Sequence, residues 1–158
     1  MSRIGVFGGS FNPVHNGHVI MSLCAREAAS LDQVLVIPAS VSPHKEESDM
    51  LPCATRVACL EAAFGGLDGF TVDTREIDRG APSYTVDTLA ELQEEHPHGE
   101  LFFILGGDAL QTLPTWRDFS QLCEMATFLW VRRPGDGDDD RQAQSVQGLR
   151  LESVPCPR

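Results

Sequence analysis

The chain has 158 residues, of which 42% are hydrophobic and 22% charged, and its formal net charge is −11. A single domain of this length buries roughly two-thirds of the surface of its unfolded chain, so we expect one hydrophobic core. The acidic charge argues against a nucleic-acid partner. The sequence shows no leader before Ile4 and no apolar run near the ~20 residues that a membrane span needs. We therefore expect a cytoplasmic protein with no membrane partner.

Short apolar runs alternate with helical patterns along the chain, which predicts a parallel α/β sheet. The expected strands are Ile4–Phe7, Val34–Pro38, Phe70–Asp73, Leu101–Leu105 and Thr127–Val131. The expected helices are His18–Ala29, Ala54–Phe64, Tyr84–His96 and Phe119–Met125. Ser83 suits the N-cap of the third helix and Pro97 its end. Near-continuous apolar strands are covered on both faces, so we predict a Rossmann-like, doubly wound, five-stranded parallel sheet with helices on both faces.

A glycine pair and two histidines follow the first expected strand. Gly8 and Gly9 can adopt positive φ and let the backbone approach an anion, and the next helix offers free N–H groups at its start. Ser10 adds a hydroxyl donor, while His15 and His18 are three residues apart and can both donate to oxygen on one side. The pattern predicts a phosphate site and no metal site, because two histidines alone lack further ligands. The alternative is one histidine as a helix cap and the other packed in the core.

Polar or glycine-containing loops also follow the other expected strands. In chain order they are Ser42–Lys45, Asp78–Thr85, Gly106–Asp108 and Arg132–Gly135. Ligands of doubly wound sheets bind beyond the carboxyl ends of the strands, near the point where strand order reverses. We therefore expect these loops and the glycine–histidine segment to form one site.

Several single residues in these loops suit nucleotide binding. Lys45 is the only lysine of the chain and offers a mobile charge to phosphates, although a solvated lysine is the alternative. Asp108 can accept hydrogen bonds from ribose hydroxyls, and Gly106 permits close backbone approach. For Asp108 the alternative is a helix N-cap. Arg133 can place a cation near the phosphates or the adenine.

The motif His15-Asn16-Gly17-His18 resembles the HxGH signature of a nucleotidyltransferase superfamily. Further motifs follow in the order seen in bacterial nicotinate-nucleotide adenylyltransferases, namely Ser42–Lys45, Arg75–Gly80, Ser83–Leu89, Phe103–Asp108 and Trp116. The resemblance runs from residue 4 to about Gly135. It implies transfer of the adenylyl group of ATP to nicotinate mononucleotide, giving deamido-NAD and pyrophosphate in NAD biosynthesis, with Mg²⁺ carried by ATP.

The resemblance also implies a role for each group of motif residues. His15, His18 and Lys45 would act on the phosphates during in-line transfer. The residues that would bind ATP are Gly8, Gly9, Ser10, Gly106, Asp108 and Arg133. Backbone N–H groups at Ser83, Tyr84 and Thr85 would hold the nicotinate carboxylate, and Trp116 would stack on the pyridine ring. Core packing is the alternative for Trp116.

The sequence departs from the family pattern at three places. Family members carry Thr at Ser10 and Asp at Asn12, and they continue with an Ile-Ser-Ser-Thr-x-Ile-Arg segment where this sequence stops. We expect a nucleotidyltransferase domain over 1–135, then an acidic linker and a truncated or shortened carboxyl-terminal segment over 136–158. Uncovered apolar sheet surface could be hidden in a homo-oligomer. The alternatives are a nucleotidyltransferase with another phosphate acceptor, or a nucleotide-binding module without turnover.

Overall fold

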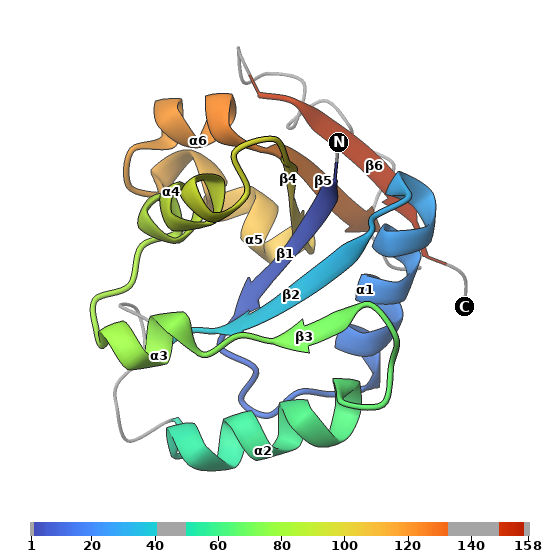
Figure 1. The fold of residues 1–158 in the computed structure, drawn as a ribbon, viewed down its shortest axis with the longest axis vertical. Helices are drawn as coiled ribbons and strands as arrows, with labels where there is room; N and C mark the ends of the chain where they lie inside the picture. Colours follow the sequence, from blue (N-terminus) through green and yellow to red (C-terminus); the bar gives the residue numbers. More distant parts are fainter. Residues whose placement is uncertain (1, 41–49, 133–148, 157–158) are drawn as a thin grey trace.

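The computed structural model describes residues 2–40, 50–132 and 149–156. Within them the strands are β1 (Arg3–Gly9), β2 (Gln33–Pro38), β3 (Phe70–Val72), β4 (Glu100–Leu105), β5 (Thr127–Arg132) and β6 (Leu151–Pro155). All neighbouring strands pair in parallel, in the order β3-β2-β1-β4-β5-β6. The chain therefore starts in the middle of the sheet, and the strand order reverses beside β1 (Figure 1).

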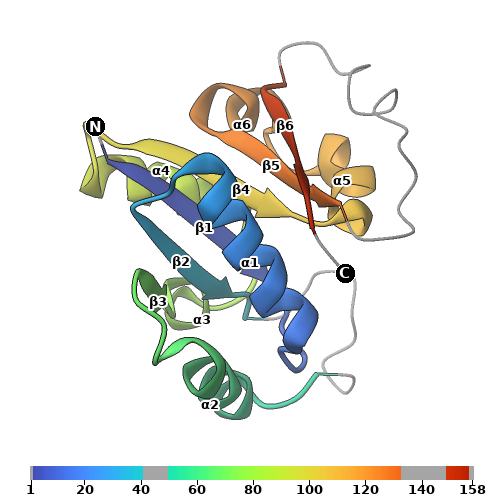
Figure 2. The same cartoon turned by 90° about the vertical axis from the view of Figure 1, so that its right-hand side faces the viewer.

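Helices cover both faces of this sheet (Figure 2). They are α1 (Asn16–Ala29), α2 (Cys53–Phe64), α3 (Arg75–Arg79), α4 (Thr85–Glu95), α5 (Gly107–Thr112) and α6 (Phe119–Met125), with a 3₁₀ turn η2 (Leu113–Thr115). Apolar side chains of α1 and α2 belong to one hydrophobic cluster, and those of α4 and α6 belong to a second. The doubly wound arrangement expected from the sequence is confirmed.

The central strands supply both clusters by simple alternation. In β4, Phe102 and Ile104 face the cluster under α1 and α2, whereas Leu101, Phe103 and Leu105 face the cluster under α4 and α6. All five side chains are at most 5% exposed. Successive side chains of a strand point to opposite faces, so a continuous apolar run is the pattern that a strand buried on both sides requires.

The prediction of five strands was wrong, because β6 adds a sixth at the edge of the sheet. β6 pairs in parallel with β5, with Val131 opposite Val154. Its sequence contains two exposed polar residues, Glu152 and Ser153, and only Val154 is buried. Such an edge strand lacks the apolar run that marks the central strands, so its sequence does not predict it.

The shorter helices also escaped prediction. α3 has five residues and α5 has six, which is too few to show helical periodicity in a sequence. The expected end of the third long helix at Pro97 is confirmed, since α4 stops at Glu95 with His96 as its C-cap. None of the helices in the described part of the chain has the length and apolarity needed to cross a membrane.

We predict that β6 contributes to stability through Val154, which is 3% exposed and packs in the cluster under α1. Val154→Ala removes two buried carbon groups and should lower the free energy of unfolding by about 1.5 kcal/mol or more. Urea denaturation followed by circular dichroism measures this loss. The exposed neighbour Ser153 provides the control, and equal effects of Val154→Ala and Ser153→Ala would contradict the packing of β6 against α1.

Candidate functional site

The loop between β1 and α1 is anchored by an aromatic side chain. Phe11 has φ 46°, a left-handed conformation that is uncommon for a residue other than glycine. Its ring is 3% exposed and lies edge-to-face against Phe7 at 5.2 Å and against His18 at 5.1 Å between ring centroids. These contacts tie the loop both to the end of β1 and to the first turn of α1, and they balance the cost of the backbone conformation.

The two motif histidines cap α1 reciprocally. His15 is the N-cap, and its Nδ1 accepts the backbone N–H of Gly17 at 3.1 Å. Nδ1 of His18 in turn accepts the backbone N–H of His15 at 3.1 Å, and the two rings stack with centroids 3.8 Å apart. Because each Nδ1 is an acceptor, each neutral ring carries its proton on Nε2. Capping of α1 and donation to a phosphate are thus compatible roles of these histidines. Capping uses Nδ1 of each ring and fixes the orientation of Nε2.

The glycines of this loop behave differently from the prediction. Neither Gly8 nor Gly9 has a positive φ, because both lie in β1; Phe11 takes the left-handed conformation instead. A side chain at Gly8 would meet the ring of Phe103 at 3.3 Å, and one at Gly9 would meet Phe11 at 3.6 Å. Close packing against the ring of Phe103 is therefore a second reason for glycine at Gly8, whereas the distance at Gly9 is an ordinary contact. Approach of an anion to this backbone stays a prediction.

The expected N-cap of α4 was wrong. Tyr84 occupies the N-cap position, and the hydroxyl of Ser83 donates instead to the carbonyl oxygens of Glu76 and Gly80, each at 3.1 Å. Ser83 therefore binds back to α3, and α4 begins one residue later, at Thr85. The prediction failed because the Ser83 hydroxyl binds the carbonyl oxygens of Glu76 and Gly80, which come within reach only when α3 and its C-cap are folded.

Trp116 follows η2 and is half-buried. Its ring lies edge-to-face on Phe103 at 5.6 Å, and its Nε1–H donates to Oγ1 of Thr112 at 3.1 Å. The neighbouring Arg117 places its guanidinium 4.6 Å from the centre of the Tyr84 ring. These contacts fix the indole on the edge of the core. They also bring the stretch before α4 close to the stretch after η2.

The stretch that follows β4 contributes Gly106 and Asp108. Gly106 is the N-cap of α5, so the N-cap alternative for Asp108 is wrong, and Asp108 is an exposed residue in the first turn. A side chain at Gly106 would meet Met21 of α1 at 3.2 Å. The backbone of Gly106 therefore lies close to Met21, which is one turn of α1 after His18.

The predicted site residues thus gather at the carboxyl edge of the sheet, apart from two that lie outside the described residues. Gly8 and Gly9 are the last two residues of β1, Gly106 directly follows the neighbouring strand β4, and the ring of Phe103 contacts both Trp116 and the space beside Gly8. Ser10 is half-buried in the same loop. The two residues outside the described ranges are Lys45 and Arg133. Among the described residues, no group of three or more His, Cys, Asp or Glu side chains is arranged to hold a metal ion.

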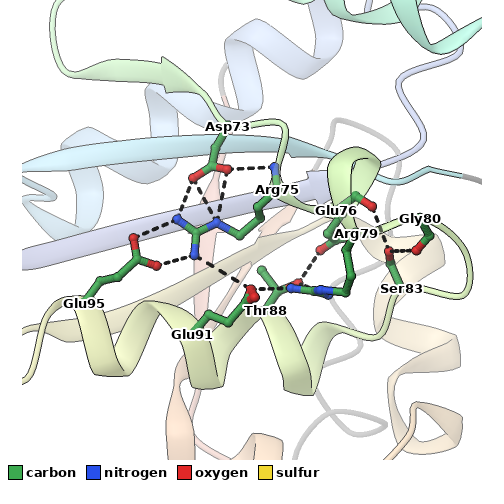
Figure 3. A network of polar contacts seen from close by, with 9 residues as sticks. All are labelled: Asp73, Arg75, Glu76, Arg79, Gly80, Ser83, Thr88, Glu91 and Glu95. Atoms are coloured by element: carbon green, nitrogen blue, oxygen red, sulfur yellow. Dashed lines mark hydrogen bonds and ion pairs between the residues drawn. The ribbon is translucent and has the colours of Figure 1, made fainter.

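A charged network between α3 and the length of α4 was not predicted from the sequence (Figure 3). Arg75 of α3 binds the carboxylate of Asp73 at 2.8 Å and also pairs with Glu95 of α4. Arg79 pairs with Glu91, one turn before Glu95. The four-residue spacing of the two acids on α4 and of the two arginines on α3 was the available signal.

Glu76 is the buried member of this network. Its carboxylate accepts a hydrogen bond from Oγ1 of Thr88 at 2.7 Å, and both side chains are less than a tenth exposed. Burial raises the pKa of Glu76, although the bond from Thr88 and the charge of Arg79 oppose that rise. The network joins α3 to α4 and so holds the stretch that contains Ser83 and Tyr84.

Comparisons with known proteins agree with this arrangement. The cytidylyltransferase-like family matches residues 6–155. The chain belongs to that family. It is 40% identical over 135 residues to the probable nicotinate-nucleotide adenylyltransferase of Geobacillus thermodenitrificans, which covers 85% of this chain and 62% of that protein. The corresponding protein of Gloeobacter violaceus is 38% identical over 155 residues, covering 98% of this chain and 75% of that protein.

The fold has close counterparts among solved structures. The Plasmodium falciparum nicotinic acid mononucleotide adenylyltransferase complexed with NaAD superposes with a TM-score of 0.82 at 17% identity, covering 100% of this chain and 77% of that protein. The family resemblance inferred from the motifs is confirmed by the two sequence relatives and by the family match over residues 6–155. The chain spans 62% of the length of the relative from G. thermodenitrificans.

We predict a pH-dependent effect of Glu76→Gln. Because burial raises the pKa of Glu76, the folded state disfavours its ionised form, and stability is lost as the pH rises through the raised pKa. Glutamine keeps an oxygen acceptor for Thr88 without the charge. The variant should melt at a higher temperature than the parent at pH 8, and the gain should shrink toward pH 4.

Differential scanning calorimetry across this pH range measures the effect. Glu94→Gln is the matched control, because Glu94 is an exposed carboxylate on α4, the helix whose Thr88 binds Glu76. A lower melting temperature for Glu76→Gln at pH 8, or an identical gain for Glu94→Gln, would contradict the assignment.

Proposed function

We propose that this protein transfers the adenylyl group of ATP to nicotinate mononucleotide, giving deamido-NAD and pyrophosphate. A phosphate oxygen of the mononucleotide attacks the α-phosphorus of ATP, and the bond from that phosphorus to the bridging oxygen breaks as pyrophosphate leaves. The observation that carries the proposal is the reciprocal capping of α1 by His15 and His18 at the central strand β1. The names of the sequence relatives support the choice of substrates.

The histidine pair suits stabilisation of the transition state. Negative charge grows on the oxygens of the α-phosphate and on the departing pyrophosphate, and fixed donors stabilise it without reorganising. His15 and His18 would donate through Nε2, with Gly8, Gly9 and Ser10 lining the same phosphates. Mg²⁺ would arrive with ATP and neutralise the triphosphate charge.

The remaining motif residues would bind the two nucleotides. Additional cations would come from Lys45 and Arg133, while Gly106 and Asp108 would meet the adenosine of ATP. The start of α4, at Ser83, Tyr84 and Thr85, would hold the nicotinate carboxylate, and Trp116 would stack on its ring. The short distance between Tyr84 and Arg117, next to Trp116, supports grouping these residues in one subsite. We also propose that the enzyme is cytoplasmic and that copies of the chain can associate as a homo-oligomer.

The direct test is pyrophosphate release from ATP and nicotinate mononucleotide in the presence of Mg²⁺. We expect release that depends on both substrates, with deamido-NAD formed in equal amount. Release with a different phosphate acceptor alone would favour another nucleotidyltransferase activity. Binding of ATP by calorimetry without any release would favour a binding module.

We predict that two substitutions of His18 distinguish its role as a hydrogen-bond donor from its role in capping α1. His18→Ala removes both, whereas His18→Gln places at the third helical position a residue that can still accept the N–H of His15. Both variants should lose about 10²–10³ in turnover, because each lacks the Nε2 donor. His18→Gln should melt closer to the parent. Near-normal turnover in a folded His18→Gln variant would contradict the role of His18 Nε2 as a donor to the phosphates.

We predict a preference for the acid mononucleotide over its amide. An anion at the start of a helix gains about 0.3–2 kcal/mol, so this source alone gives a preference of up to about thirtyfold. Competition between nicotinate and nicotinamide mononucleotides, with the products separated by chromatography, measures it. Equal use of both would contradict a carboxylate subsite at Ser83–Thr85, while the KM for ATP serves as the internal control.

A further inference from the structure

Arg56 of α2 is the largest charged side chain in the core, and it is 0% exposed. Its guanidinium donates to backbone carbonyl oxygens from three separate stretches of chain. Nη1 reaches the carbonyls of Ser10 and Ala39, each at 2.7 Å, and Nη2 reaches that of Ser40 at 2.7 Å. Nε donates to the carbonyl of Leu51 at 3.2 Å. Within the described ranges, no carboxylate forms an ion pair with it.

The carbonyls that Arg56 binds come from the loops that surround the predicted phosphate site. Ser10 belongs to the loop that leads from β1 to His15, and Ala39 and Ser40 directly follow β2. Leu51 precedes α2. The guanidinium is planar and presents its donors in a fixed fork, so it holds these acceptors at set positions relative to one another.

Two further bonds join the same loops. The side-chain oxygen of Asn12 accepts the backbone N–H of Leu51 at 2.8 Å, and the N–H of Ala39 donates to the carbonyl of Gly9 at 2.8 Å. The loop before α1 is therefore tied to the end of β2 and to the start of α2 by side-chain and backbone bonds together. Arg56 is the member of this set that contacts all three stretches.

We propose that Arg56 is a positioning residue for adenylyl transfer: through the carbonyls of Ser10, Ala39 and Ser40 it sets the distance between the histidine loop and the stretch after β2. It acts through the backbone and does not touch substrate. The inference rests on the proposed function, because that function assigns the histidine loop to the phosphates. A displacement of about 1 Å in such a loop is enough to lower a rate strongly.

The chain contains a matched control for this proposal. Arg26 of α1 also binds backbone carbonyls, those of Asp68 at 2.7 Å and Leu31 at 3.4 Å. These acceptors precede β3 and β2, at the opposite edge of the sheet from the site. Arg26→Lys therefore removes the same kind of fork without touching the loops around the histidines.

The experiment compares Arg56→Lys with Arg26→Lys in the full chain. Lysine keeps the charge, but its donors sit on one nitrogen and cannot span the same acceptors. At a temperature where circular dichroism shows both variants folded, Arg56→Lys should lower kcat/KM for ATP at least tenfold, mainly through kcat. Arg26→Lys should stay within twofold of the parent. Equal losses in both variants, or no loss in either, would overturn the proposal.

Hydrogen exchange separates this proposal from the proposed function. In Arg56→Lys, amides in peptides covering Gly8–His18 should exchange at least tenfold faster, while peptides of β5 keep their protection. This readout needs no turnover, so a parent that releases no pyrophosphate would refute the function and leave the loop placement measurable. Unchanged exchange in Gly8–His18 would overturn the positioning role in either case.

A second variant covers the case in which Arg56→Lys does not fold. Asn12→Ala cuts the bond to Leu51, which joins the same loops from outside the core. It should accelerate exchange in Gly8–His18 and lower kcat/KM for ATP several-fold, and Asn12→Asp should restore both because it keeps an oxygen acceptor. Parent-like hydrogen exchange and kinetics in Asn12→Ala would show that the hydrogen bonds joining this loop to the stretches after β2 and before α2 do not position it.

Discussion

β1 runs through the middle of a parallel sheet, with β2 on one side and β4 on the other, and this placement decides where the loops of the chain come together. Parallel strands end at one edge, so the loops after β1, β2 and β4 are neighbours at the point where strand order reverses. Alternating side chains on each strand bury both faces under helices. Among the described residues, the motif residues Gly8–His18 and Gly106–Asp108 lie at the end of β1 and in the stretches that follow β1 and β4.

The loop after β1 is held from two directions. On one side Phe11 packs between Phe7 and His18, and on the other the carbonyl of Ser10 accepts from the buried Arg56. His15 and His18 then close the start of α1 through their Nδ1 atoms. The same contacts that stabilise the helix start thus fix the orientation of both imidazoles, so structure and the proposed chemistry use different atoms of the same side chains.

Much of the fold could be predicted from the sequence, because the long helices and the central strands carry strong apolar patterns. The helix Phe119–Met125 has the predicted bounds, and the others differ by one or two residues. β6 and α3 could not be predicted, since each is short and gains its structure from a partner distant in sequence. Within the site, motif order located the loops. The left-handed Phe11, the acceptors of Ser83 and the carbonyls around Arg56 depend on tertiary contacts that no local pattern records.

We propose that the loops at the carboxyl edge of the sheet form one nucleotide site. Amide chemical shifts of ¹⁵N-labelled protein, followed while Mg²⁺-ATP and then nicotinate mononucleotide are added, test it most directly. We predict that ATP shifts amides in Gly8–His18 and Gly106–Asp108, and that the mononucleotide adds shifts at Ser83–Thr85 and Trp116. Shifts centred on the opposite edge, around Leu31, Asp68 and Gly99, would contradict the account.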